Sequence, residues 1–203
     1  MRDGALTMDA LQRVDGVDPA AVKAAMQSYV KWVSAMQARA SAALDAHTEP
    51  KWVISTGQPY AGGWCRPQTD GPGLRARALM RYAGAITPAD DPERVAVWGL
   101  IKFDLDWLAQ GDATVGLNGC DLWEETTDPN FLWNRVTQRR ALVWGQRFAE
   151  EMGDGARAAG YAKAAAATDL QDPVADHTDP DTGGGTGFIT ECPASGGGAS
   201  CQK

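Results

Sequence analysis

Apolar residues recur at spacings of three and four along most of the chain, which is the pattern of amphipathic α-helices. In residues 19–36 this spacing gives one continuous apolar stripe, formed by Val22, Met26, Tyr29, Val30, Val33 and Met36. Asp18 precedes the stretch at the position of an N-cap, and Pro19 stands at the first helical position. These residues therefore predict a long helix with a defined start.

Five further segments show the same periodicity, at residues 3–14, 71–86, 90–110, 128–153 and 153–168. The stripe of 71–86 is carried by Leu74, Leu79, Tyr82 and Ile86, and that of 90–110 by Val95, Trp98, Ile101, Leu105 and Leu108. Segments 90–110 and 128–153 each open with an Asp-Pro pair, which marks a helix start. We expect an all-α chain.

Extended structure is expected in two short stretches. "KWVIS" at 51–55 contains β-branched residues, and "TGFITEC" at 186–192 alternates weakly between apolar and polar positions. Residues 169–203 are rich in Asp, Pro, Gly and Ser, which predicts a loop. We expect one domain over residues 1–203 with a loop-rich end, and we expect its chemistry in the connections between helices.

The composition argues against several classes of partner. The 203 residues are 44% hydrophobic and 22% charged, as in soluble globular domains. A net charge of −7 argues against nucleic-acid and anionic-membrane surfaces, which require clustered Lys and Arg. No apolar run is long enough to span a bilayer. The opening "MRDGALTMDAL" lacks the apolar core of a signal peptide.

Several common chemistries lack their motifs. There is no GxSxG elbow, "TGGGTG" lacks the Lys-Ser/Thr of a phosphate-binding loop, and no metal-ligand spacing occurs. We therefore expect neither a metal nor a cofactor, and we interpret His47 and His177 as surface histidines. The chain has four cysteines, Cys65, Cys120, Cys192 and Cys201. They could form two disulfides or remain four free thiols, and the composition does not decide between these states.

Two connections combine arginine with aromatic or acidic residues. Arg2 and Asp3 stand at the start of the first helix. The alternative to a functional role is that Asp3 simply caps this helix. Trp64 and Arg66 lie in the glycine- and proline-rich stretch before the helix of 71–86, which Asp70 could cap. Trp64 could pack in the core or serve as a platform on which a sugar ring stacks.

The third connection, "GCDLWEET" at 119–126, places Asp121, Glu124 and Glu125 around Trp123. One interpretation is a solvated acidic loop. Alternatively, a single turn brings the three carboxylates together, and their mutual repulsion and an apolar tryptophan wall raise the pKa of one carboxyl group. Such a group can donate a proton to a leaving oxygen. Paired acids, tryptophans and arginine together point to a carbohydrate ligand.

Five stretches in this order resemble the glucoamylases of glycoside hydrolase family 15: "RDGALTMDAL", "EPKW", "GWCRPQTDGPGLRARAL", "CDLWEE" and "RRALVWGQRFA". The resemblance extends to about residue 149. It implies an α/α toroid of six inner and six outer helices, with the active site at one end of the inner ring. It also implies a secreted, inverting exo-hydrolase that releases glucose from the non-reducing ends of starch and α-glucans and is monomeric when complete.

The resemblance also implies a role for each matching residue. Glu124 is the general acid, and Asp121 supports its loop electrostatically. The remaining candidates bind substrate. Arg2 and Asp3 hold hydroxyls of the terminal glucose, Trp64 lines the next subsite and orients the acid, and the other contacts come from Arg66, Leu122, Trp123 and Glu125.

Residues 1–203 lack a match to the family motif that carries the second carboxylate, which activates water from about 6.5–9.5 Å away. We therefore expect an incomplete toroid that alone does not hydrolyse starch at an enzymatic rate and leaves apolar residues such as Val95, Trp98 and Ile101 exposed. Two alternatives stay open: a related toroid enzyme that cleaves another glucoside, and an inactive glucan-binding protein.

The resemblance also suggests how the cysteines pair. Cys65 follows Trp64 and Cys120 precedes Asp121, and the family brings these two motifs together in the cleft. We predict a Cys65–Cys120 disulfide, which requires Cα atoms within about 7 Å. Two buried free thiols are the alternative. Cys192 and Cys201 could close a small loop of their own.

Overall fold

The computed structural model describes residues 2–40, 45–110, 117–129 and 131–168. Six helices dominate this part of the chain: α1 (Arg2–Leu11), α2 (Pro19–Gln37), α3 (Gly71–Gly84), α4 (Pro92–Gln110), α5 (Leu132–Glu151) and α6 (Gly155–Ala167). Two short antiparallel ribbons accompany them, β1 (Trp52–Val53) with β2 (Gln58–Pro59), and β3 (Gly119–Cys120) with β4 (Thr127–Asp128). The predicted all-α class is confirmed.

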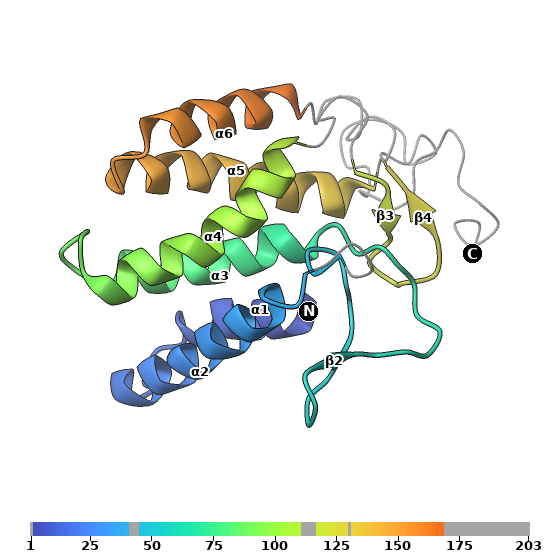
Figure 1. Ribbon diagram of the computed structural model, residues 1–203, viewed down its shortest axis with the longest axis horizontal. Coiled ribbons are helices and arrows are strands. Elements are labelled where there is room, and N and C mark those ends of the chain that lie inside the picture. The colour runs from blue at the N-terminus through green and yellow to red at the C-terminus, as the bar shows by residue number, and fades with distance from the viewer. Residues whose placement is uncertain (1, 41–44, 111–116, 130, 169–203) are drawn as a thin grey trace, which may run out of the picture.

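Consecutive helices alternate between two layers (Figure 1). α3 packs between α1 and α5 in one layer, while α4 packs beside α2 and α6 in the other. The odd-numbered helices all begin at the same end of the molecule, and both ribbons lie at that end. This arrangement brings the start of α1, the connection before α3 and the connection before α5 together.

The core lies between the two layers, and Trp98 and Ile101 belong to it. Trp98 is 5% exposed and packs against Phe148 of α5, and Ile101 is fully buried. The expectation that a partial toroid exposes these two residues is therefore wrong. Val95 is 48% exposed, because the buried stripe of α4 runs through Val97, Trp98 and Ile101 and leaves Val95 on another face of the helix.

Most predicted helix starts are confirmed. The carboxylate of Asp18 accepts a hydrogen bond from the backbone N–H of Ala20 at 3.0 Å, as expected of an N-cap. Asp91 does the same for Glu93 at 2.8 Å at the start of α4. Asp3 lies within the first turn of α1 because the helix already includes Arg2, so its interpretation as a cap is wrong.

The prediction for residues 128–153 placed the helix start too early. Asp128 pairs with Gly119 in the β3–β4 ribbon, so α5 begins at Leu132 and ends at Glu151. β1 confirms a strand within 51–55, although it is only two residues long. The predictions for 169–203, including the strand at 186–192, lie outside the described residues.

A fully buried ion pair ties three helices together. Arg75 of α3 donates two hydrogen bonds to the carboxylate of Asp104 of α4, the first from Nε at 2.7 Å. Gln37 of α2 donates to the same carboxylate at 3.3 Å. Bidentate pairs of this kind fix the relative positions of the elements that carry them. Among the described helices, none is both long enough and apolar enough to cross a membrane.

Candidate active site

The buried carboxylate of Asp70 joins the starts of three helices. Arg2, in the first turn of α1, donates from Nε to Asp70 Oδ2 at 2.5 Å, and the indole N–H of Trp133, in the first turn of α5, donates to the same oxygen at 2.7 Å. Asp70 itself precedes α3, but its side chain makes no capping hydrogen bond to that helix, so the predicted cap is wrong. The positive ends of helix dipoles favour a carboxylate here.

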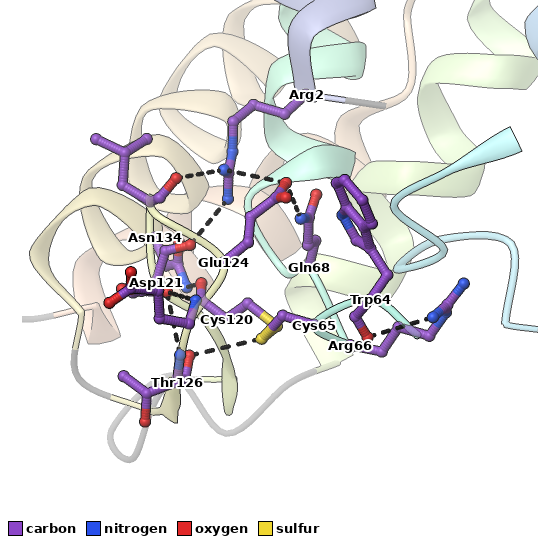
Figure 2. The surroundings of a disulfide bond; sticks show 12 residues. Arg2, Trp64, Cys65, Arg66, Gln68, Cys120, Asp121, Glu124, Thr126 and Asn134 are labelled. Atoms are coloured by element: carbon purple, nitrogen blue, oxygen red, sulfur yellow. Dashed lines mark hydrogen bonds and ion pairs between the residues drawn. A yellow bond between two sulfur atoms is a disulfide. The ribbon is translucent and has the colours of Figure 1, made fainter. Parts of the chain in front are cut away.

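The same arginine also contacts the acidic segment, as Figure 2 shows. Arg2 donates from Nη1 to the carbonyl oxygen of Leu122 at 2.9 Å and from Nη2 to that of Asp121 at 3.3 Å. Its Nη1 also lies 3.7 Å from Oε1 of Glu124. The Arg2 side chain is 7% exposed, so this guanidinium is a fixed cation under the acidic segment.

The acidic segment forms the loop of the β3–β4 hairpin. Its turn is closed by a hydrogen bond from the backbone N–H of Glu124 to the carbonyl of Asp121 at 3.2 Å. The Asp121 carboxylate accepts from the backbone N–H groups of Glu125 at 2.7 Å and Thr126 at 3.3 Å. A turn is present in this segment, as predicted; that it brings the three carboxylates together stays a prediction. At Glu124 the backbone has φ of 64°, in the left-handed region.

The Glu124 carboxyl group is held by two side chains and remains accessible. Gln68 donates from its amide to Glu124 Oε1 at 2.5 Å, and Arg2 lies near the same oxygen. The Glu124 side chain is 29% exposed, so a ligand can reach it. Trp123 is 74% exposed, so the predicted tryptophan wall beside Glu124 is wrong. The residues that hold Glu124 instead come from α1 and from the connection before α3.

Trp64 is an exposed aromatic ring near this acid. It is 41% exposed, which excludes the interpretation as a core residue. Tyr60 meets it edge-on at a centroid distance of 6.4 Å, and the Lys51 ammonium lies 3.6 Å from its ring centroid. In Figure 2 the ring of Trp64 and the side chain of Glu124 project in the same direction from their two loops.

Arg66 holds the loop that presents Trp64. Its Nε and Nη2 donate to the two carboxylate oxygens of Glu49 at 3.0 and 2.9 Å, and these hydrogen bonds raise the pKa of Arg66 above its usual range. It also donates to the backbone carbonyls of Tyr60, Gly62 and Trp64. The Arg66 guanidinium, which was predicted to contact substrate, therefore makes its hydrogen bonds to Glu49 and to backbone carbonyls of the protein.

A disulfide connects the Trp64 loop with the Glu124 hairpin. Cys65 and Cys120 are bonded with an S–S distance of 2.07 Å and a Cα–Cα distance of 6.0 Å, so the predicted pair is confirmed. The backbone N–H of Cys120 donates to the carbonyl of Pro67 at 2.8 Å, and Asn134 of α5 donates to the Cys120 carbonyl at 2.9 Å. Cys192 and Cys201 lie outside the described residues.

Replacing both Cys65 and Cys120 by alanine is expected to lower the free energy of unfolding by about 2–4 kcal/mol. The helical circular dichroism signal should persist, because the bond joins the loop before α3 to strand β3 and lies in no helix. Urea denaturation of this variant and of the parent protein measures the difference. Equal unfolding free energies, with or without a reductant, would show that the two loops are held together without the disulfide.

The predicted site residues separate into two groups. The structure brings Arg2, Asp121, Leu122 and Glu124 into direct contact, and the disulfide joins their hairpin to the Trp64 loop. Asp3, Trp123 and Glu125 are exposed, and Arg66 is engaged by Glu49.

Sequence reasoning missed the residues that hold this site, which are Glu49, Gln68, Asp70 as an ion-pair partner, and Trp133. Gln68 and Asp70 stand in the stretch "RPQTDGP". Polar residues directly before a predicted helix were the available signal, and the structure shows that both are buried. Among the described residues, no cluster of three His, Cys, Asp or Glu side chains could hold a metal.

Comparison with known proteins identifies relatives of the chain. The family model described as glycosyl hydrolases family 15 matches residues 1–179. Glucoamylase-1 of Arthroderma benhamiae is 39% identical over 106 residues, which cover 51% of this chain and 17% of that protein. A glucoamylase of Blastobotrys adeninivorans is 28% identical over 169 residues, which cover 76% of this chain and 26% of that protein.

Solved structures show the same fold. The glucoamylase of Saccharomycopsis fibuligera superposes with a TM-score of 0.72 at 22% identity, over 89% of this chain and 40% of that one. The glucoamylase of Hormoconis resinae superposes with a TM-score of 0.63 at 28% identity, over 77% of this chain and 28% of that one. The two helical layers are thus part of an α/α toroid, as predicted, and the chain spans less than half the length of these relatives.

Proposed function

The chain belongs to glycosyl hydrolase family 15, and from this premise we propose that it is part of a glucoamylase. The proposed reaction is inverting hydrolysis that releases glucose from the non-reducing ends of starch and related α-glucans. The observation that carries this proposal is the accessible Glu124 carboxyl group, held by Gln68 and Arg2 at the end of the toroid where the odd-numbered helices begin.

In this proposal Glu124 is the general acid that protonates the glycosidic oxygen. Because the amide of Gln68 donates to Oε1, that oxygen acts as an acceptor, and the transferable proton resides on Oε2. After transfer, the Arg2 guanidinium 3.7 Å from Oε1 stabilises the carboxylate that remains. Asp121 keeps the hairpin in shape by accepting two backbone hydrogen bonds.

An inverting hydrolase also needs a carboxylate on the opposite face of the sugar to activate water, about 6.5–9.5 Å from the acid. The proposal assigns no residue of 1–203 to this role. To the described residues the proposal assigns the general acid and part of the sugar pocket. Trp64 offers a stacking surface, Asp3 an exposed carboxylate in the first turn of α1, and the remaining contacts come from Leu122, Trp123 and Glu125.

The product of the first turnover tests the reaction type. In the full-length protein that contains this chain, proton NMR should show β-glucose as the first product of maltotriose hydrolysis, because inversion converts an α-linkage into a β-anomer. The α-anomer as first product would contradict the inverting mechanism. No glucose release from maltotriose or soluble starch by the folded full-length protein would contradict the proposed activity.

Trp64→Ala is expected to weaken the affinity of the protein for maltotriose by at least about fivefold, because truncation of an aromatic binding residue commonly costs more than 1 kcal/mol. Isothermal titration in a Glu124→Gln background, which prevents hydrolysis during the measurement, gives the change. Ile54→Ala is the control, at an exposed residue to which the proposal assigns no sugar contact. Wild-type affinity in the Trp64 variant would show that this ring is not a sugar platform.

We also propose that the protein works outside the cell. The Cys65–Cys120 disulfide supports this, because such bonds form and persist in oxidising compartments. Detection of the protein in culture medium, compared with a cytoplasmic marker, tests the proposal.

A further inference from the structure

Arg2 places a positive charge beside Glu124, which by itself works against acid catalysis. Its Nη1 lies 3.7 Å from Oε1 of Glu124, as Figure 2 shows. An opposite charge at this range favours the ionised form of a carboxyl group, commonly by about 1–3 pH units. A general acid must instead keep its proton until the leaving oxygen takes it. If Glu124 is the acid, the charge of Arg2 has to be offset from within the protein.

Asp70 supplies an offsetting negative charge. Its carboxylate is fully buried and accepts a hydrogen bond from Arg2 Nε at 2.5 Å. Within the described residues, Arg2 is the only ion-pair partner of Asp70, and it is also the only cation in ion-pair range of Glu124. The two carboxyl groups therefore share one guanidinium, Asp70 at Nε and Glu124 at Nη1.

The contact with Asp70 also fixes the orientation of the guanidinium. An arginine side chain has five N–H donors in one plane. Nε gives its hydrogen to Asp70, while Nη1 donates to the carbonyl of Leu122 and Nη2 to that of Asp121. One N–H group is left on each terminal nitrogen. Because Nε is held by Asp70, both terminal nitrogens of Arg2 face the hairpin that carries Glu124.

Trp133 of α5 holds Asp70 in turn. Its indole N–H donates to Oδ2 of Asp70 at 2.7 Å, the oxygen that also accepts from Arg2. The other oxygen, Oδ1, is buried without a hydrogen-bond partner. In the part of the chain that the structure describes, Arg2 and Trp133 are thus the two donors that keep this carboxylate in place.

We propose that Asp70 is a positioning residue for the acid. By offsetting the charge of Arg2 it lets Glu124 keep its proton, and Trp133 fixes Asp70 for this task. The inference rests on the proposed role of Glu124 as the general acid, and it adds to that role the means by which the protein sets the pH range of the reaction.

Two further carboxylates share the hairpin of Glu124. Asp121 accepts hydrogen bonds from the backbone N–H groups of Glu125 and Thr126, and the side chain of Glu125 is exposed. Neither contributes to the contacts of Asp70 described above. A change at Asp70 therefore leaves the charges on the hairpin itself as they are.

Asp70→Asn in the full-length protein tests the proposal. Asparagine keeps an oxygen for both donors but carries no charge. The charge of Arg2 is then no longer offset, so the ionised form of Glu124 is favoured and its proton is lost at lower pH. The alkaline limb of the kcat–pH profile on maltotriose should therefore move to lower pH by at least about 0.5 unit.

Asp106→Asn is the matched control for this shift. It also removes one carboxylate that pairs with an arginine, here Arg157 of α6 at 3.0 Å. The two variants change the net charge equally. Only the variant at Asp70 should move the limb, whereas the control should keep the pH profile of the wild type.

Trp133→Phe is a second variant, which decides the question if Asp70→Asn does not fold. It keeps an aromatic ring on α5 and removes the N–H donor. Asp70 is then held by Arg2 alone, so the orientation of the guanidinium beside Glu124 is less fixed. We expect kcat to fall at least about threefold with little change in KM, while circular dichroism shows wild-type helix content.

Two results would overturn the proposal in an enzyme that releases glucose. One is an alkaline limb that stays in place in a folded, active Asp70→Asn variant, and the other is wild-type kcat in Trp133→Phe. Absence of glucose release by the folded wild-type protein is a different outcome, because it contradicts the proposed function itself and this inference with it.

Discussion

Glu124→Gln is expected to lower kcat of the full-length enzyme by about 10²–10⁴-fold while KM changes little. Glutamine keeps the size of the side chain and leaves the hairpin that Asp121 organises in place. It removes the only group on this side chain that can give a proton to the leaving oxygen. Steady-state kinetics on maltotriose, with circular dichroism to confirm folding, gives the measurement.

Glu125→Gln is the matched control for this experiment. Glu125 is the neighbouring residue, its side chain is exposed, and only its backbone N–H contributes to the hairpin through Asp121. As a proposed substrate ligand, it should affect KM more than kcat. Turnover in the Glu124 variant similar to wild type, or an equal loss of kcat in both variants, would contradict the assignment of Glu124 as the acid.

Asp104→Leu is expected to lower the free energy of unfolding by about 3–5 kcal/mol. The change leaves the Arg75 guanidinium charged, fully buried and without its main partner. Burial of an uncompensated charge costs much more free energy than the loss of one hydrogen bond. Urea denaturation with linear extrapolation measures the difference.

The double variant Arg75→Met/Asp104→Leu separates the cost of an unpaired charge from that of lost packing. It should recover most of the stability, because replacement of both partners by apolar groups removes the charge as well. A loss below about 1 kcal/mol in the single variant would mean that water reaches Arg75. A double variant as unstable as the single one would mean that packing dominates.

The helical fold could be predicted from the sequence because each helix carries its own signals. Asp18 with Pro19, and Asp91 with Pro92, mark starts that depend on neighbouring residues only. The start of α5 was misplaced because Asp128 is paired with Gly119 in a ribbon. That pairing joins residues nine positions apart in the sequence, and helical periodicity does not report it.

The candidate site was predicted less completely, for a related reason. Motif resemblance pointed to Arg2, Trp64 and Glu124, but it did not indicate contacts within the protein such as those of Arg66 with Glu49. The support of Glu124 by Gln68 spans 56 residues, and the contact of Arg2 with Asp70 spans 68. Such pairs form only after the helices pack, so their partners could not be read from local sequence.

The left-handed backbone at Glu124 bears on how this loop would evolve. A φ of 64° is unfavourable for glutamate by roughly 1–2 kcal/mol and is readily adopted by glycine and asparagine. Selection for stability alone would therefore drive position 124 toward those residues, and the protein would become more stable as it lost its proposed acid. Under the proposed role of Glu124, glutamate at this position costs stability and serves acid catalysis, and a change to glycine or asparagine would remove the proposed acid while stabilising the loop.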